Sequence, residues 1–302
     1  MISRSALSIR GRVVQAVRDF FREAGYLEVD TPVRVPAPAN EAHIDAVPSG
    51  PVFLRTSPEL HMKRLLAAGL ERIYQLGPCF RAGEQGRRHS PEFALLEWYR
   101  AGADYRDTLD EACRLLRHVA HDTLGTESLV FDGCRVDLAG DCLRLPVGRA
   151  FRELAGWDPC VAFDADRFDL DLVGKVEPQL PTGRPVALMD YPPALAALAR
   201  CRDGKPPVAE RWELYVAGVE LANAFGELTD PLEQRRRFEE CRAAREAAGK
   251  TGYPMDEPFL AALERGLPAC SGVALGMDRL AMLFADETDI AAVRPFCRET
   301  TL

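Results

Sequence analysis

The sequence predicts an α+β fold in which helices flank an antiparallel β-sheet. Strand-like segments occur as neighbours in the chain, at 71–81 with 93–100 and again between 185 and 226. This order favours hairpin pairing, because strands of a parallel sheet alternate with helices. We find no internal repeat and no linker that divides the 302 residues. We therefore expect one domain over 1–302.

The N-terminal part begins with a predicted helix. Apolar residues recur at helical spacing from Ile9 to Phe21, and Gly25 ends the pattern. A short extended run follows at 26–32 and stops at a proline. The stretch 33–51 is rich in Pro, Ala and Asn, and it is predicted to be a loop.

A second helix has a clear start signal. Ser57 is predicted to cap it with Pro58 at its first position, and it ends before Gly69. The other elements predicted in this part are a strand at 52–55, strands at 71–81 and 93–100 joined by a polar loop, and a helix at 104–123.

Residues 125–180 show the weakest pattern, and we expect a variable insertion there. Beyond it the sequence predicts strands from 185 onward, a hairpin that turns at Ala217–Gly218, a charged helix from Asp230–Pro231 to Gly249, a strand at 271–276 and a final apolar helix at 277–286.

Composition excludes several function classes. With 38 basic and 46 acidic residues the net charge is −8, which argues against a surface wholly devoted to nucleic acid. The apolar stretches are too short to span a membrane, and the N-terminus shows no secretory signal. Nine cysteines without a C-x-x-C spacing and five dispersed histidines argue against zinc. We expect a cytoplasmic protein with free thiols and no membrane contact.

Three glutamates interrupt an apolar, strand-like stretch. Glu213, Glu220 and Glu227 are spaced seven apart. A turn at Ala217–Gly218 would bring Glu213 and Glu220 together on paired strands, where like charges destabilise the sheet unless something neutralises them. A divalent cation that also binds phosphate oxygens would do so. The alternative is that one carboxylate faces solvent or contacts an arginine.

Arginines and glycines suggest an anion site. Arg81 ends a strand, and Arg279 opens the last helix behind Gly272 and Gly276. Arginine suits bidentate binding of phosphate, and glycine lets a backbone approach a ligand closely. The sequence has neither a P-loop nor a Rossmann fingerprint. A nucleotide would therefore need another type of site.

Two segments offer carboxylates to an ammonium group. Ser57–Pro58–Glu59 stands at a helix start, and Glu97–Trp98–Tyr99 lies in a strand. Taken alone, the two segments are equally consistent with a helix cap and a structural pair.

Taken in order, these segments resemble the catalytic domain of class II aminoacyl-tRNA synthetases. Motif 1 corresponds to about 9–32, ending in LEVDTP, motif 2 to about 71–100, and motif 3 to about 272–285, starting with GVALGMDRL. The segments TSPELHMKRLL (56–66), FRAGEQGRRHSPEFALLEWY (80–99) and GVELANAFGELTDP (218–231) are similar to the lysyl branch. The resemblance covers about 7–285 and implies the class II fold.

One difference from the lysyl-tRNA synthetases limits the resemblance to a smaller group of proteins. Lysyl-tRNA synthetases carry an anticodon-binding domain before motif 1, whereas here the motif 1 helix begins within ten residues of Met1. The chain therefore resembles the elongation factor P–(R)-β-lysine ligases, which are paralogues without that domain. This implies ATP-dependent activation of (R)-β-lysine as an adenylate, with pyrophosphate released, and transfer to a lysine of elongation factor P. Aminoacylation of tRNA is disfavoured.

The resemblance also implies roles for individual residues. Arg81 would contact the α-phosphate and the substrate carboxylate, and Arg279, sandwiching adenine with Phe93, would reach the γ-phosphate. These two arginines are the expected catalytic residues. Glu213 and Glu220 would hold Mg²⁺. The other residues expected around ATP are Ala82, Gly83, Glu84, Ser90, Leu221 and Gly276.

For the amino acid, the resemblance implies a pocket of carboxylates. Ser57, Pro58 and Glu59 would meet one amino group, and Glu97, Tyr99 and Glu227 would surround the other. Asn223 would lie near the substrate carboxylate and Phe225 against the aliphatic stem. Ala274 stands where lysyl-tRNA synthetases commonly have glycine, and its methyl group would reshape the pocket.

Two other functions stay open at this point. One is a free-standing enzyme that forms lysyl adenylate for another acceptor, and the other is a non-catalytic regulator that binds an amino acid. The family also implies a homodimer built on motif 1, with Pro32 at the interface. Arg87–Arg88 and Arg235–Arg237 are candidate acceptor contacts, or else solvated surface.

Overall fold

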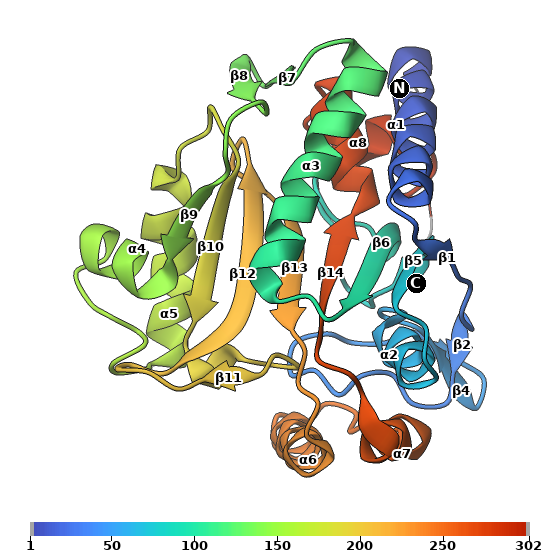
Figure 1. Cartoon of the computed structure of the whole chain (residues 1–302), viewed down its shortest axis with the longest axis vertical. Coiled ribbons are helices and arrows are strands. Elements are labelled where there is room, and N and C mark those ends of the chain that lie inside the picture. Colours follow the sequence, from blue (N-terminus) through green and yellow to red (C-terminus); the bar gives the residue numbers. More distant parts are fainter. Residues whose placement is uncertain (1–2, 300–302) are drawn as a thin grey trace.

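A mixed nine-stranded sheet runs through the computed structural model, which describes residues 3–299. Its strands follow the order β1-β5-β6-β14-β13-β12-β10-β9, and β11 pairs with β12. The strands from β5 to β10 pair antiparallel. At the two edges, β1 pairs with β5 and β9 with β10 in parallel. Helices surround this sheet (Figure 1).

The strands of the large sheet are β1 (Leu27–Glu28), β5 (Arg72–Phe80), β6 (Glu92–Ala101), β9 (Leu143–Pro146), β10 (Val186–Tyr191), β11 (Cys201–Arg202), β12 (Val208–Val216), β13 (Val219–Gly226) and β14 (Cys270–Gly276). A small sheet contains β2 (Arg34–Val35), β3 (Pro48–Ser49) and β4 (Val52–Leu54), and β7 (Ser128–Phe131) forms a hairpin with β8 (Cys134–Asp137).

The helices are α1 (Arg4–Glu23), α2 (Glu59–Ala67), α3 (Tyr105–Leu124), α4 (Val147–Leu154), α5 (Ala165–Asp171), α6 (Pro231–Ala247), α7 (Glu257–Gly266) and α8 (Met277–Ala285). α1, α3 and α8 pack together over one face of the sheet, around a core that contains Trp98 and Trp212. α2, α6 and α7 enclose a second core with Tyr99 and Phe259. α4 and α5 cover the β9–β10 edge.

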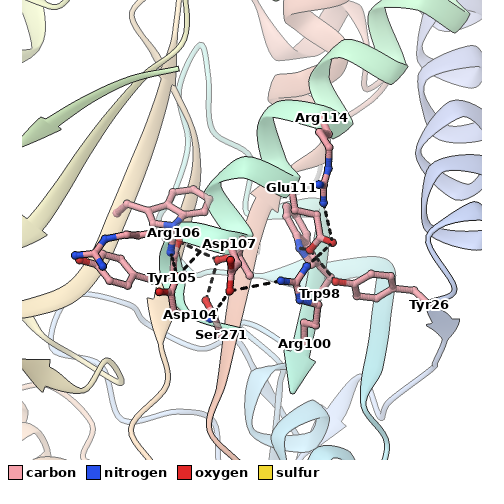
Figure 2. A network of polar contacts seen from close by, with 12 residues as sticks. Tyr26, Trp98, Arg100, Asp104, Tyr105, Arg106, Asp107, Glu111, Arg114 and Ser271 are labelled. Atoms are coloured by element: carbon pink, nitrogen blue, oxygen red, sulfur yellow. Dashed lines mark hydrogen bonds and ion pairs between the residues drawn. The ribbon is translucent and has the colours of Figure 1, made fainter. Parts of the chain in front are cut away.

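A buried carboxylate on α3 fixes the position of β6 (Figure 2). Glu111 accepts hydrogen bonds from the Tyr26 hydroxyl at 2.7 Å and Trp98 Nε1 at 3.0 Å, and it pairs with Arg100 at 3.3 Å. A buried charge is tolerated when it is paired and hydrogen-bonded in this way. The network therefore holds the back of the strand whose opposite face carries Glu97.

Start and turn signals predicted several elements correctly. Ala217 and Gly218 both have positive φ, 50° and 70°, as a two-residue hairpin turn requires. The Asp230 carboxylate caps α6 by accepting from the backbone N–H of Leu232 at 2.8 Å, and Pro231 is the first helical residue. The predicted α+β class is confirmed.

Other expectations need correction. α2 begins at Glu59, one residue later than predicted, and Pro58 rather than Ser57 is the cap residue. Ser57 still contributes, because its Oγ accepts from the backbone N–H of Glu59 at 2.9 Å. The stretch 33–51, predicted as loop, contains β2 and β3, which pair with β4.

One helix was not predicted, and the segment predicted to be a variable insertion contains a strand of the large sheet. α7 has its own start signal, Asp256 followed by Pro258, which the sequence analysis did not use. The segment 125–180 is not separate from the sheet, because β9 pairs with β10 and extends it. Within residues 3–299 no helix is long and apolar enough to cross a membrane.

Candidate active site

One face of the central strands is polar, although the other face is a continuous apolar core. The cross-strand register places one row of residues side by side across β5, β6, β14, β13 and β12: Gln75, Glu97, Ala274, Asn223 and Glu213. A second row consists of Tyr99, Gly272, Phe225 and Arg211. Because side chains alternate along a strand, both rows lie on the same face. Sequence-distant candidates thus meet on one surface.

A bulge in β13 brings Glu220 to this face. Glu213 pairs with Asn223, and Tyr215 pairs with Glu220. Moving two residues along β12 therefore corresponds to moving three residues along β13, which is the register shift of a β-bulge. Strict alternation from Asn223 would have directed Glu220 to the opposite face. The extra residue lets Leu221 and Ala222 both enter the apolar core. Glu213 and Glu220 therefore share one side of the sheet.

A cavity of about 1000 Å³ lies over this face. Many of the residues expected around ATP and the amino acid line it: Arg81, Glu84, Ser90, Phe93, Glu220, Leu221, Asn223, Phe225, Ala274, Gly276 and Arg279. Ala82 and Gly83 belong to the loop that follows β5. Gly83 has φ +77°, a backbone conformation that favours glycine.

Arg279 is held rigidly at one end of the cavity. Its Nη1 donates to the backbone carbonyl of Glu220 at 2.7 Å and its Nε to that of Arg88 at 3.3 Å. Its Nη2 lies 2.7 Å from His89 Nε2. Burial and the charge of Arg279 lower the pKa of His89, which suits a neutral ring that accepts this hydrogen bond.

Arg81 lies against Phe93. Its guanidinium carbon is 5.0 Å from the ring centroid, a cation–π distance, and it forms an ion pair with Glu84 at 3.6 Å. The guanidinium over the Phe93 ring is thus that of Arg81, whereas the resemblance implies an adenine between Phe93 and Arg279. Both arginines line the cavity and point positive charge at it.

The two glutamates expected to hold Mg²⁺ each contact an arginine. Glu213 accepts from Arg211 at 2.5 Å and from the Tyr215 hydroxyl at 3.0 Å. Glu220 pairs with Arg279 at 3.3 Å. Removal from solvent and the adjacent Glu213 raise the pKa of Glu220. Among the described residues, no three His, Cys, Asp or Glu side chains form a metal-binding group.

The donor chemistry of Glu213 and Glu220 nevertheless fits Mg²⁺. This ion prefers carboxylate oxygens and keeps several positions for water or phosphate, so two protein ligands suffice when a nucleotide supplies the rest. The mutual repulsion of Glu213 and Glu220 is the signature of a pair that a cation would stabilise.

A buried polar cluster adjoins the cavity, behind Ala274 and Phe225. Glu97 accepts from the Ser57 hydroxyl at 2.5 Å and from the Tyr99 hydroxyl at 3.2 Å. Glu59 and Glu227 both bind Lys63, at 2.5 and 2.6 Å. Burial and then the repulsion from Glu59 raise the pKa of Glu97 to about 8. The expected amino-group contacts are therefore together, but they are packed inside the protein.

The cluster requires a glycine in β14. A Cβ atom at Gly272 would lie 2.1 Å from the Tyr99 ring and 2.6 Å from Glu227 Oε1. Tyr99 and Glu227 have little room to move aside, because only 3% and 1% of their surfaces are exposed. Gly272 thus has a packing role, whereas the sequence suggested that this glycine lets the backbone approach a ligand closely.

Sequence reasoning missed Arg211 and Lys63. Arg211 lines the cavity, donates to Asn223 Oδ1 at 3.2 Å and to Glu213, and stacks on Tyr191 at 4.5 Å. The period-two pattern of β12 was a usable signal, because Arg211, Glu213 and Tyr215 alternate with core residues. The matching signal for Lys63 was its helical spacing of four from Glu59.

Glu41 also lines the cavity, and it lies in the stretch 33–51, which was predicted to be a loop and from which no site residue was expected. Arg245 of α6 anchors this loop by donating to the backbone carbonyls of Glu41 and Ile44 at 2.8 and 2.9 Å. Burial raises the pKa of Glu41 to about 7, although the charge of Arg81 opposes the shift. The loop thus adds an acidic group to the lining of the cavity.

Comparison with known proteins agrees with this geometry. The family model described as tRNA synthetases class II (D, K and N) matches residues 2–300. The chain belongs to this family. The lysyl-like segments and the residues of the site face all lie within the part of the chain that this family model matches.

Individual relatives fall into two groups. The chain is 40% identical to an elongation factor P–(R)-β-lysine ligase of Hamiltonella defensa over 97% of its own length and 94% of the relative. A protein of the same name from Proteus mirabilis is 41% identical over 91% and 89%. A lysine–tRNA ligase of Moorella thermoacetica is 37% identical, and the match covers 94% of this chain but 63% of that protein. The predicted resemblance is confirmed.

Proposed function

We propose that this chain is an ATP-dependent ligase that activates (R)-β-lysine as β-lysyl adenylate and transfers it to a lysine of elongation factor P. The observation that carries the proposal is the match to relatives named for this reaction, which covers about nine tenths or more of each chain. The site supports it, because the arginines that line the cavity suit a nucleotide and the buried carboxylates that adjoin it suit a diamino acid.

In the first step, the substrate carboxylate attacks the α-phosphorus of ATP and the bond to pyrophosphate breaks. No side-chain nucleophile is needed, so the protein contributes positioning and charge. Arg81 would neutralise the carboxylate and the α-phosphate, and Arg279 would bind the polyphosphate from its fixed position on the Glu220 carbonyl. Glu213 and Glu220 would hold Mg²⁺, which supplies positive charge to phosphate oxygens.

In the second step, the amine of the acceptor lysine attacks the carbonyl carbon of the mixed anhydride. The bond to AMP breaks and the nitrogen loses a proton. The cluster of Glu59, Glu97 and Glu227 would meanwhile hold the ammonium groups of the substrate and keep its carbonyl facing the cavity. An amino acid without a second ammonium would leave a buried carboxylate without a cation, which strongly disfavours its binding.

Intact-mass measurement of elongation factor P tests the proposal directly. After incubation with the enzyme, ATP and (R)-β-lysine, we expect an increase equal to one β-lysyl residue. Elongation factor P with its acceptor lysine replaced by arginine is the matched control and should keep its mass. An unchanged mass of the natural acceptor, despite formation of the adenylate, would contradict the assigned acceptor.

A second candidate is a lysyl-adenylate-forming enzyme that serves another acceptor. The similarity to a lysine–tRNA ligase favours it, since that relative is named for α-lysine. Competition between the two lysine isomers separates the candidates. A non-catalytic regulator is the weaker alternative, because Arg81, Arg279, Glu213 and Glu220 are all present on the cavity side of the sheet.

A further inference from the structure

The proposed reaction gives no role to the buried ammonium group of Lys63. Lys63 is 1% exposed, and its Nζ lies 2.5 Å from Glu59 Oε1 and 2.6 Å from Glu227 Oε2. Although burial opposes its charge, the carboxylates of Glu227 and Glu59 hold the pKa of Lys63 above its usual range. Lys63 is therefore a permanent ammonium group inside the carboxylate cluster.

The cluster carries more negative charge than Lys63 neutralises. Glu59, Glu97 and Glu227 supply three carboxylates to one ammonium. Glu97 accepts its hydrogen bonds from the neutral hydroxyls of Ser57 and Tyr99. The nearby guanidinium of Arg200 is engaged by Glu210.

A buried ion pair that only supported the fold would be neutral, since an uncompensated buried charge is strongly destabilising. When all three carboxyl groups are ionised, they leave two negative charges beyond the one that Lys63 neutralises. Because burial raises the pKa of Glu97 and of Glu227 to about 8, protons balance these two charges in the absence of a substrate, and two ammonium groups would replace the protons when a substrate binds. A diamino acid brings two ammonium groups. In the proposed reaction Arg81 neutralises the carboxylate of the substrate, which therefore does not enter this count.

We infer that Lys63 is a specificity-determining residue, whose ammonium reduces the carboxylate cluster to the net charge that one diamino acid neutralises. It acts through Glu59 and Glu227, which it holds in place, and is thus a positioning residue. The inference rests on the proposed function only in that the substrate carries two amino groups.

Two features of Lys63 make this role testable. Its charge lowers the pKa of Glu227, which burial raises to about 8. Without Lys63, Glu227 would stay protonated to higher pH and attract a substrate ammonium less. Its long stem is also fully enclosed, with a side chain 0% exposed, so methionine can replace the stem without the charge.

The test is pyrophosphate exchange by Lys63→Met. We expect the KM for (R)-β-lysine to rise about tenfold or more, with the KM for ATP unchanged. The pH below which the KM for (R)-β-lysine rises should be higher in Lys63→Met than in the wild type. The preference for β-lysine over the analogue that lacks the distal amino group should fall in parallel. Lys250→Met removes an ammonium paired with Asp45 outside the cluster and should change none of these quantities.

Unchanged selectivity and an unchanged pH profile in folded Lys63→Met would overturn the inference. If that variant does not fold, Lys63→Met combined with Glu59→Gln removes one charge of each sign and serves in its place. The KM of this double variant for (R)-β-lysine should be lower than that of Glu59→Gln alone, because the second substitution restores the net charge of the cluster. Lys63→Arg keeps the positive charge and should retain the selectivity of the wild type. A KM of the double variant that is no lower than that of Glu59→Gln, or as great a loss of selectivity in Lys63→Arg, would contradict a role for charge.

The outcome is separable from that of the proposed function. If wild-type enzyme prefers L-α-lysine, the proposed substrate is wrong, but the same series with α-lysine still tests Lys63, because α-lysine also carries two amino groups. If the wild-type enzyme prefers β-lysine and Lys63→Met has the same selectivity and pH profile as the wild type, the proposed function stands and only the inference about Lys63 fails.

Discussion

Arg279 shows how a single side chain joins separate parts of the site. One guanidinium contacts the Glu220 carbonyl on β13 and the Arg88 carbonyl in the motif 2 loop, and it faces the cavity. Its position is fixed before any ligand binds. Such preorganisation is effective because little rearrangement is needed when charge develops on the phosphates.

Replacing Arg279 by alanine should therefore abolish most adenylate formation without unfolding the protein. We expect the rate of pyrophosphate exchange to fall about 100-fold or more, with a melting temperature close to that of the wild type. The control is Arg242→Ala, which removes an exposed arginine paired with Glu246 on α6. Near-normal exchange by the Arg279 variant would show that the assignment of the site is wrong.

The raised pKa values of Glu97 and Glu227 predict a pH-dependent affinity. Burial is the largest cause in both cases, and it raises the pKa of each carboxyl group to about 8. The carboxyl groups are thus largely protonated at neutral pH and attract an ammonium group only when ionised. The KM for β-lysine should fall about tenfold between pH 7 and pH 8.5. A KM that is flat or rises over this interval, measured by pyrophosphate exchange, would contradict the account.

At the scale of elements, β14 shows what sequence predicts and what it does not. Its strand character, the glycines and the helix that follows were evident from SGVALGMDRL. That Gly272 accommodates the Tyr99 ring was not, because the contact joins strands that are distant in sequence. The bulge was equally invisible: the turn at Ala217–Gly218 predicts Glu220 beside Glu213, but strict alternation along β13 would then direct Asn223 to the opposite face.

Gly272→Ala should be destabilising and Gly11→Ala stabilising. The new methyl group at 272 would overlap the Tyr99 ring, which costs about 1–3 kcal/mol of unfolding free energy. Gly11 lies within α1 with no atom in the way, so alanine should add about 0.5–1 kcal/mol through helix propensity. Urea unfolding measures both changes. Equal effects would show that the close approach at Gly272 is not required.

At the scale of the whole molecule, composition and motif order predicted the fold class and the family. The arrangement of charge inside the protein could not be predicted. Lys63 reads as an ordinary surface residue until α2 and the sheet place it beside Glu227. Such placement depends on packing between segments more than a hundred residues apart, which local patterns do not encode.

The family implies a homodimer, and the β1 edge is where we expect its interface. Leu27 is a large apolar residue that is 54% exposed on this edge strand, close to α1 and Pro32. Leu27→Glu should lower the dimer fraction in sedimentation analysis, because it places a charge in an apolar contact. Val161→Glu, at an apolar position that is even more exposed (72%) and lies between α4 and α5 in the chain, should not. A wild-type monomer at micromolar concentration would contradict the expectation.

Pyrophosphate exchange into ATP tests the central claim most directly. Purified protein would be given (R)-β-lysine, L-α-lysine or no amino acid in parallel. The account predicts exchange that strongly favours β-lysine and is absent without an amino acid. Exchange with α-lysine alone would redirect the enzyme to another lysyl acceptor, and no exchange with either isomer would contradict the assignment of this site as an adenylate-forming centre.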